Sequence, residues 1–159
     1  MTGNYLTLLE ESLQKKLQVM AEIQQYNLKQ QEIFQSDNVD IDRFDEYVEE
    51  KEDLIEKLTA LDNGFESLYV KVSKELGNGG REKYKDQIKR LQQLVTEVTE
   101  TSVTIQAQEA RNKKLIEDFF RKEREGIRMG RQTSKAAYDY YKNMNRSSVV
   151  PPQFMDSKK

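Results

Sequence analysis

The sequence predicts an all-α protein: an antiparallel, elongated three-helix bundle or coiled coil, followed by a short, mobile fourth helical segment. Apolar residues recur at heptad spacing through three long stretches, which short polar or glycine-rich connections separate. Apolar residues make up 36% of the 159 residues and charged residues 34%, a balance that suits long helices sharing one apolar seam. No alternating run bounded by turn residues predicts a strand.

The first helix is expected over residues 4–35. Most of its seam positions are apolar, and polar residues fill three of them. The helix should end at residues 36–38, where short polar side chains compete for backbone hydrogen bonds. The apolar seam residues are Leu6, Leu9, Leu13, Met20, Ile23 and Phe34, and the polar ones are Lys16, Asn27 and Gln30.

The second helix is expected over residues 40–76. Asp40 can cap the first turn, and Val39 with Phe44 can form a hydrophobic staple. Gly77 suits the position just after the helix. The seam comprises Phe44, Tyr47, Leu54, Leu58, Leu61, Phe65, Leu68 and Val72, and Lys51 interrupts it once.

The third helix is expected over residues 82–125. Because both connections are short, neighbouring helices should run antiparallel, and the third helix should run beside the first and continue past its end. Its polar seam positions either fix the register, which we favour, or leave a thin seam with room for another helix. The apolar stripe is Ile88, Leu91, Val95, Val98, Ile105, Ile116 and Phe119, interrupted by Ser102, Glu109 and Asn112.

Three regions follow from this pattern. Residues 1–125 form the helical bundle, residues 126–146 form a hinged basic amphipathic segment, and residues 147–159 form a flexible tail with two prolines. Gly126 and Gly130 weaken the helix at the boundary, and in so charged a segment we interpret them as a hinge.

Charge is distributed unevenly along the chain. Residues 1–120 carry 16 basic and 24 acidic groups, whereas residues 121–146 carry eight basic and three acidic groups. The most acidic block is residues 37–56, with ten acids against Arg43 and Lys51. The topology places this block and the basic segment at the same end, so we expect the basic segment to face the acidic block or a partner, not nucleic acid.

The composition argues against catalysis and cofactors. The chain has no cysteine and no histidine, so thiolate nucleophiles and the commonest zinc ligands are excluded. Asp42, Asp45, Glu49 and Asp53 share one helix face, which we interpret as a solvated face and not as a metal site. We expect no enzyme, no metal and no cofactor. No apolar run approaches the ~20 residues that span a bilayer and no signal peptide is evident, so we expect a cytoplasmic protein without stable membrane insertion.

Several motifs together resemble the FlgN-type flagellar export chaperones. They are "DNVDIDRFDEYVEEKEDLIEKLTALDNGFESLY" at 37–69, "QAQEARNKKLIEDFF" at 106–120, and "AAYDYY" at 136–141 with its Phe-x-Asp-x-Lys-Lys ending. The resemblance covers nearly the whole chain.

The resemblance implies a chaperone that binds the terminal helices of hook–filament junction proteins (FlgK- and FlgL-like), prevents their premature assembly and delivers them to the export gate protein FlhA. The client surface would lie on the third helix and beyond, and one of three tyrosines would dock on the gate. The client-binding residues would be Leu115, Ile116, Phe119, Phe120, Ile127 and Met129, and the gate-docking candidates are Tyr138, Tyr140 and Tyr141.

Alternatives remain open from sequence. Exposed apolar residues at the end of a helix usually mark an interface, but they can equally staple the following segment to the bundle. A weakly docked C-terminal segment that client displaces would reconcile both readings. The competing classes are a structural coiled-coil or adaptor protein without a client, a related filament-cap-type chaperone, and an adaptor for RNA or membrane surfaces. A weak homodimer fits the chaperone reading.

Overall fold

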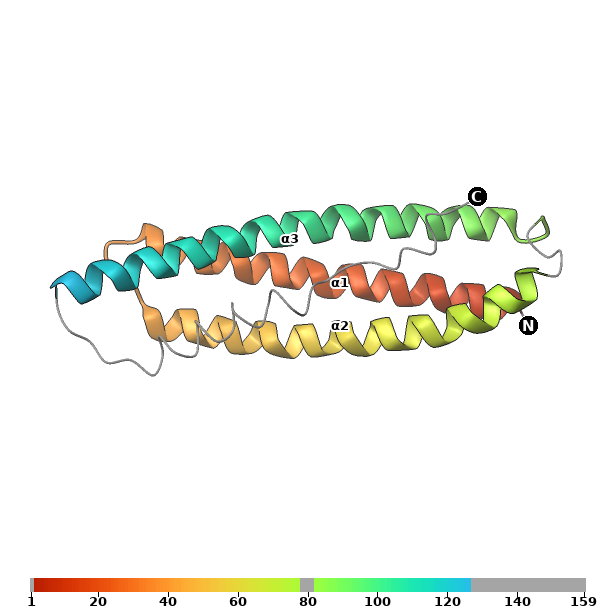
Figure 1. The fold of residues 1–159 in the computed structure, drawn as a ribbon, viewed down its shortest axis with the longest axis horizontal. Helices are drawn as coiled ribbons and strands as arrows, with labels where there is room; N and C mark the ends of the chain where they lie inside the picture. The colour runs from red at the N-terminus through yellow and green to blue at the C-terminus, as the bar shows by residue number, and fades with distance from the viewer. Residues whose placement is uncertain (1, 78–81, 127–159) are drawn as a thin grey trace. The chain divides into compact units, whose positions relative to one another are not determined.

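A computed structural model describes residues 2–77 and 82–126, which form three long helices (Figure 1). α1 spans Thr2–Gln35, α2 spans Ile41–Glu75 and α3 spans Lys85–Gly126. The prediction of an all-α fold with three helices is confirmed, and each helix end lies within three residues of its predicted position. The predicted fourth segment and tail lie outside the described residues.

The start of α2 is capped as the sequence predicts. The backbone N–H of Arg43 donates to Asp40 Oδ1 at 3.0 Å, and the N–H of Phe44 donates to the Asp40 carbonyl at 3.1 Å. α3 begins three residues later than predicted because residues 82–84 form a turn. The Tyr84 carbonyl then accepts from the N–H of Ile88 at 2.9 Å.

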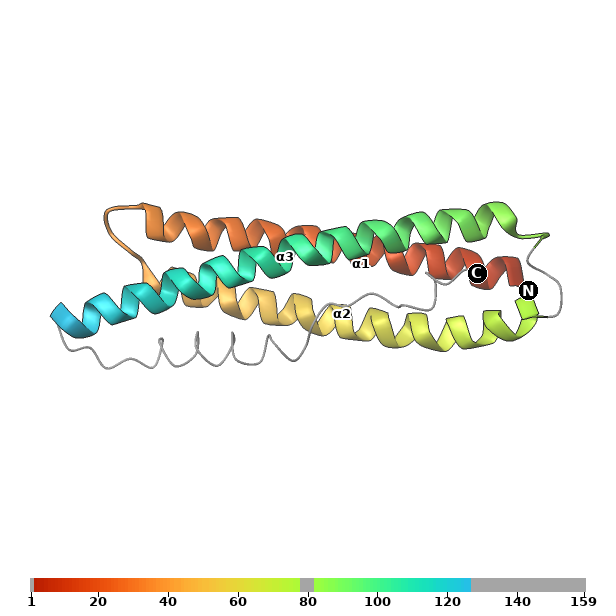
Figure 2. The same ribbon diagram turned by 45° about the horizontal axis from the view of Figure 1, so that its top comes forward.

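The helices divide into two compact units, and each is described separately. The described part of the first unit comprises residues 2–20, 56–77 and 82–102. Here α1 and α3 run parallel, because Gln87 Nε2 donates to the Gly3 carbonyl at 3.4 Å and Arg90 pairs with Glu10 at 3.3 Å (Figure 2). α2 runs antiparallel to α1, because Lys16 meets Asp62 of α2 at 2.7 Å whereas the earlier Tyr5 ring lies 5.9 Å from the later Lys71.

Most of the core of the first unit lies on the predicted seam, but Leu61, Leu68 and Ile88 are only half-buried, and Val19 is buried although it lies outside that seam. Two polar seam residues, Lys16 and Ser102, are buried in this core as well. The Lys16 side chain is 2% exposed, and its ammonium reaches Asp62, which is 40% exposed, at the edge of the unit. The lysine stem therefore fills a seam position while its charge is satisfied near solvent. The buried apolar residues are Leu6, Leu9, Leu13, Val19, Met20, Leu58, Phe65, Val72, Leu91, Val95 and Val98.

The described part of the second unit comprises residues 21–55 and 103–126. It contains the last half of α1, the first half of α2 and the last half of α3, with α2 antiparallel to the other two. Its core combines apolar and polar seam residues. The apolar ones are Ile23, Phe44, Val48, Leu54, Ile105 and Ile116, and the polar ones are Asn27, Gln30, Lys51, Gln108, Glu109 and Asn112.

Candidate functional site

An aromatic cluster occupies the end of the second unit where α1 ends and α2 begins. Its buried centre is formed by Phe44, Val48 and Ile116, none of which is more than 3% exposed. Ring contacts extend it: the centroid separations are 5.4 Å for Phe34–Phe44, 6.0 Å for Phe34–Phe119 and 5.3 Å for Phe119–Phe120. The aromatic cluster comprises Ile33, Phe34, Ile41, Phe44, Val48, Ile55, Ile116, Phe119 and Phe120.

α3 continues beyond the end of α1 in this unit. Phe119 packs against Phe34, which lies one residue before the end of α1 at Gln35, and α3 then runs on to Gly126. The seven residues after Phe119 add about 10 Å of helix at 1.5 Å per residue. α3 therefore carries a helical extension directly after the aromatic cluster, as the sequence predicts.

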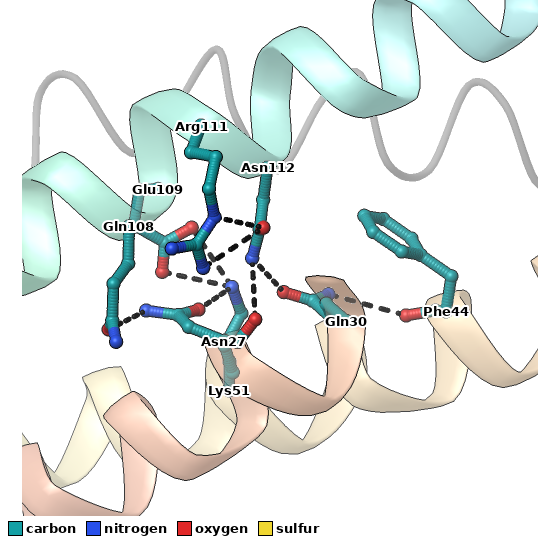
Figure 3. Close-up of polar contacts among 8 residues, drawn as sticks. All are labelled: Asn27, Gln30, Phe44, Lys51, Gln108, Glu109, Arg111 and Asn112. Carbon is teal, nitrogen blue, oxygen red and sulfur yellow. Dashed lines mark hydrogen bonds and ion pairs between the residues drawn. The ribbon is translucent and has the colours of Figure 1, made fainter. Parts of the chain in front are cut away.

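A polar layer lies beside the aromatic cluster and joins all three helices (Figure 3). At its centre the Lys51 ammonium of α2 lies 2.9 Å from both carboxylate oxygens of Glu109 on α3. The same ammonium donates to Asn27 Oδ1 of α1 at 2.7 Å. One cation thus links α1, α2 and α3. The polar layer comprises Asn27, Gln30, Lys51, Gln108, Glu109 and Asn112.

Amide side chains complete the layer. Asn27 Nδ2 donates to Gln108 Oε1 at 3.1 Å. Asn112 Nδ2 donates to the Asn27 carbonyl at 2.9 Å and lies 3.4 Å from Gln30 Oε1. Gln30 Nε2 in turn lies 3.5 Å from the Phe44 carbonyl, so the layer reaches the edge of the aromatic cluster. Helices joined by so many specific polar contacts have one preferred register.

Burial dominates the electrostatics of the central ion pair. Lys51 is 0% exposed and Glu109 is 6% exposed. Desolvation lowers the pKa of Lys51 from its ordinary 10.5 to about 8, and the attraction and hydrogen bond of Glu109 offset only part of that effect. The pair therefore fixes which residues meet and is not expected to add much stability.

Asp45 departs from the solvated acidic face predicted for α2. Asp42, Glu49 and Asp53 are exposed as expected. Both carboxylate oxygens of Asp45, however, are buried and have no hydrogen-bond partner among the described residues. Burial, and then the nearby Asp42 and Glu49, raise the pKa of Asp45 to about 7. The interpretation as a solvated face holds for three of the four acids and fails for Asp45.

The predicted client-binding residues fall partly within this site. Ile116 is buried in the aromatic cluster, Phe119 and Phe120 are half-buried in it, and Leu115 is half-buried beside it on α3. A client could reach Ile116 only if the end of α3 moved away from α1 and α2. The remaining predicted site residues, Ile127, Met129, Tyr138, Tyr140 and Tyr141, lie outside the described residues.

Two features of the site were not identified from sequence. The sequence marks Lys51 and Glu109 as polar interruptions of their seams, but it does not identify them as partners. Opposite charges at seam positions of two antiparallel helices were the signal that could have paired them. Burial of the Asp45 oxygens had no such signal, because Asp45 lies between exposed acids of the same type.

Within residues 2–77 and 82–126, none of the helices has the length and hydropathy of a membrane-spanning segment. Over the same residues, no group of three or more acidic, histidine or cysteine side chains is placed to hold a metal ion.

Comparison with known proteins gives one family match. The family model for "FlgN protein" matches residues 1–146, which include both the aromatic cluster and the polar layer. No curated protein and no solved structure matches the chain. Since the family model covers most of the sequence and the fold is the predicted three-helix one, the chain belongs to the FlgN family, the flagellar export chaperones.

Proposed function

We propose that this FlgN-family chaperone binds the terminal helices of hook–filament junction proteins (FlgK- and FlgL-like) in the cytoplasm, prevents their premature assembly and delivers them to the export gate protein FlhA. We propose no catalytic role, and FlgN is a chaperone family and not an enzyme family. The observation that carries the proposal is the half-buried pair Phe119 and Phe120, which lies at the start of the helical extension of α3.

An amphipathic client helix fits this end of the second unit. Such helices bind through apolar residues at i, i+3, i+4 and i+7, which need an apolar groove beside a helix. Phe119 and Phe120 offer partly accessible rings, and α3 extends past α1, so one side of its last turns lacks an α1 neighbour. Leu115 lies one turn earlier and lengthens the same surface. Ile127 and Met129 would continue it, as the family resemblance implies.

The client surface can be tested with single substitutions on α3. We expect Phe120→Ala to weaken binding of a peptide from a junction-protein terminus by about tenfold or more, as for a central interface aromatic. The matched control is Val103→Ala, because Val103 lies on α3 in the same unit and is 61% exposed. Isothermal titration calorimetry gives both affinities, and circular dichroism checks that each variant remains folded.

Equal affinities for Phe120→Ala and the wild type would argue against this surface. Equal losses in Phe120→Ala and Val103→Ala would show that binding does not depend on the aromatic cluster. Recovery of a junction protein with the full-length chain as bait would identify the client class.

Gate docking is a separate step and has its own test. We propose that one of Tyr138, Tyr140 and Tyr141 contacts FlhA. Each tyrosine is replaced by alanine in turn, and binding to the cytoplasmic domain of FlhA is measured with client present. We expect one variant to lose gate binding while keeping client affinity. Full gate binding by all three variants would contradict the assignment.

A further inference from the structure

The apolar seam of α3 is interrupted at the polar layer. Ile105 and Ile116 are the buried apolar side chains on its two sides, about three helical turns apart. Every buried side chain of α3 between them is polar and belongs to the polar layer. The buried residues that cluster with Ile116 are Phe44 and Val48, and Ile105 is not among them. Along α3, the polar layer therefore separates the aromatic cluster from the apolar core that contains Ile105.

The polar layer adds little net cohesion between the helices. The attraction between the Lys51 ammonium and the Glu109 carboxylate, 2.9 Å apart, is largely offset by the desolvation of both groups. The amide hydrogen bonds contribute little as well, because their groups would bond to water if the helices separated. Apolar burial, in contrast, is lost without such compensation. The end of α3 beyond the polar layer is therefore held mainly by its own apolar contacts.

Few apolar contacts hold that end of α3. Within residues 113–124, whose side chains the structure describes, Ile116 is the one buried side chain, and the two rings that α3 contributes to the aromatic cluster are only half-buried. Arg121 pairs with Asp118 at 3.0 Å, but both residues lie on α3, so this ion pair does not bind α3 to another helix. Separating the end of α3 would therefore give up only a small part of the apolar burial of the second unit.

α1 and α2 are held together more firmly at the same end of the second unit. α1 ends at Gln35 and α2 begins at Ile41, so a short connection joins them directly. The Phe34 and Phe44 rings meet with their centroids 5.4 Å apart. α3, in contrast, is joined to α2 through residues 76–84, which belong to the first unit. If the three helices part at the aromatic cluster, α3 is therefore the helix that leaves.

From these observations we propose that residues 113–126 separate from α1 and α2 as one unit. The separation ends at the polar layer, because the next apolar contact of α3, at Ile105, lies on the other side of that layer. Helices shorter than about 12–15 residues are only marginally stable in water, so this stretch unwinds when it separates. The separation exposes Ile116 together with Phe44 and Val48, which offer apolar surface to an amphipathic client helix. That use of the opening rests on the proposed function, whereas the opening itself is a property of the chain without client.

Native-state hydrogen exchange of the full chain without client tests the opening. Ile116→Val and Ile105→Val make the same change at two buried seam positions of α3. We expect Ile116→Val to accelerate exchange of the amides of residues 117–120 by about two- to tenfold, the effect of one lost methylene group. Ile105→Val should leave those rates unchanged, because Ile105 keeps its contacts when the end of α3 separates. Circular dichroism checks that both variants remain folded.

Two results would overturn the proposal. Equal acceleration of these amides in Ile116→Val and Ile105→Val would show that the end of α3 opens only when the whole unit unfolds. No acceleration in Ile116→Val, or acceleration of a single amide, would show that these amides exchange without separation of the end of α3 as one unit. Because no client is present, a negative result here is distinct from a failure of Phe120→Ala to weaken client binding.

Discussion

Lys51 places a positive charge at a position where the heptad pattern of α2 calls for an apolar side chain. Its ammonium is satisfied by Glu109 and Asn27, one residue from each neighbouring helix. Removing either charge alone leaves the other buried and uncompensated, whereas removing both leaves no buried charge and only the Asn27 oxygen without its donor. The ion pair therefore specifies the partner residues more than it stabilises the fold.

We expect Lys51→Met to lower the free energy of unfolding by about 3–5 kcal/mol, because Glu109 would remain buried without its cation. The double variant Lys51→Met/Glu109→Met should recover most of that loss, and the remainder is the cost of leaving the buried Asn27 Oδ1 without its donor. Urea denaturation monitored by circular dichroism measures both. A double variant that loses as much stability as Lys51→Met would contradict this account.

The pH dependence of stability provides a second test of Lys51. Its folded-state pKa of about 8 lies below the ordinary 10.5, so the unfolded state binds more protons between these values. Stability that depends on Lys51 therefore rises as pH increases from about 8 towards 10.5. Other groups titrate in this range, so the measured quantity is the difference in unfolding free energy between the wild type and Lys51→Met/Glu109→Met. That difference should shift in favour of the wild type as pH rises, and a constant difference would contradict the predicted pKa shift.

At the scale of the helix, α2 contains a glycine, Gly64, at a position where a larger side chain would have room. Gly64 lies within α2 and is exposed, and a Cβ added there would meet nothing within 4 Å. Glycine in a helix interior costs about 0.8–1.0 kcal/mol relative to alanine. Gly64 therefore lowers the stability of α2 without a packing reason in the described structure.

We expect Gly64→Ala to raise the free energy of unfolding by about 1 kcal/mol in thermal or urea denaturation. Gly3→Ala is the comparison at a helix end. Gly3 lies in the first turn of α1, where helices fray, so the gain there should be smaller, and its added Cβ would make only an ordinary contact with Tyr84 Cε1 at 3.4 Å. A loss of stability in Gly64→Ala would indicate that the position must bend or bind a partner.

At the scale of the whole molecule, the sequence predicts the helices better than it predicts the site. Leu9, Met20 and Val98 are buried, as predicted for seam positions. Such positions are predictable because the heptad repeat is established by many residues together, so one irregular residue does not change it. The capping role of Asp40 is local and was also predictable. The pairing of Lys51 with Glu109 and the burial of Asp45 depend on how separate helices approach each other, which no single stretch of sequence encodes.

The opposed charges of the chain lead to a prediction about client binding. If residues 132–146 cover the client surface until client displaces them, a chain ending at Arg131, which keeps Ile127 and Met129, should bind a client peptide severalfold more tightly, within a competition of a few kcal/mol. A chain ending at Arg146, which lacks only the tail, should bind like the full-length protein. Calorimetric titration compares the three, and unchanged affinity in the shortest chain would argue against a displaceable cover.

The polar layer also limits how far a client helix could replace α3 in its packing against α1 and α2. A client helix that replaced the end of α3 would gain the apolar contacts now made by Ile116, Phe119 and Phe120. Beyond them, in place of Asn112 and Glu109, it would leave the amides of α1 and the ammonium of Lys51 without partners. Exchange would therefore halt after roughly four helical turns, about 20 Å. The polar layer would therefore limit the length of client helix that can bind in this way, and the three helices would stay paired at the layer itself.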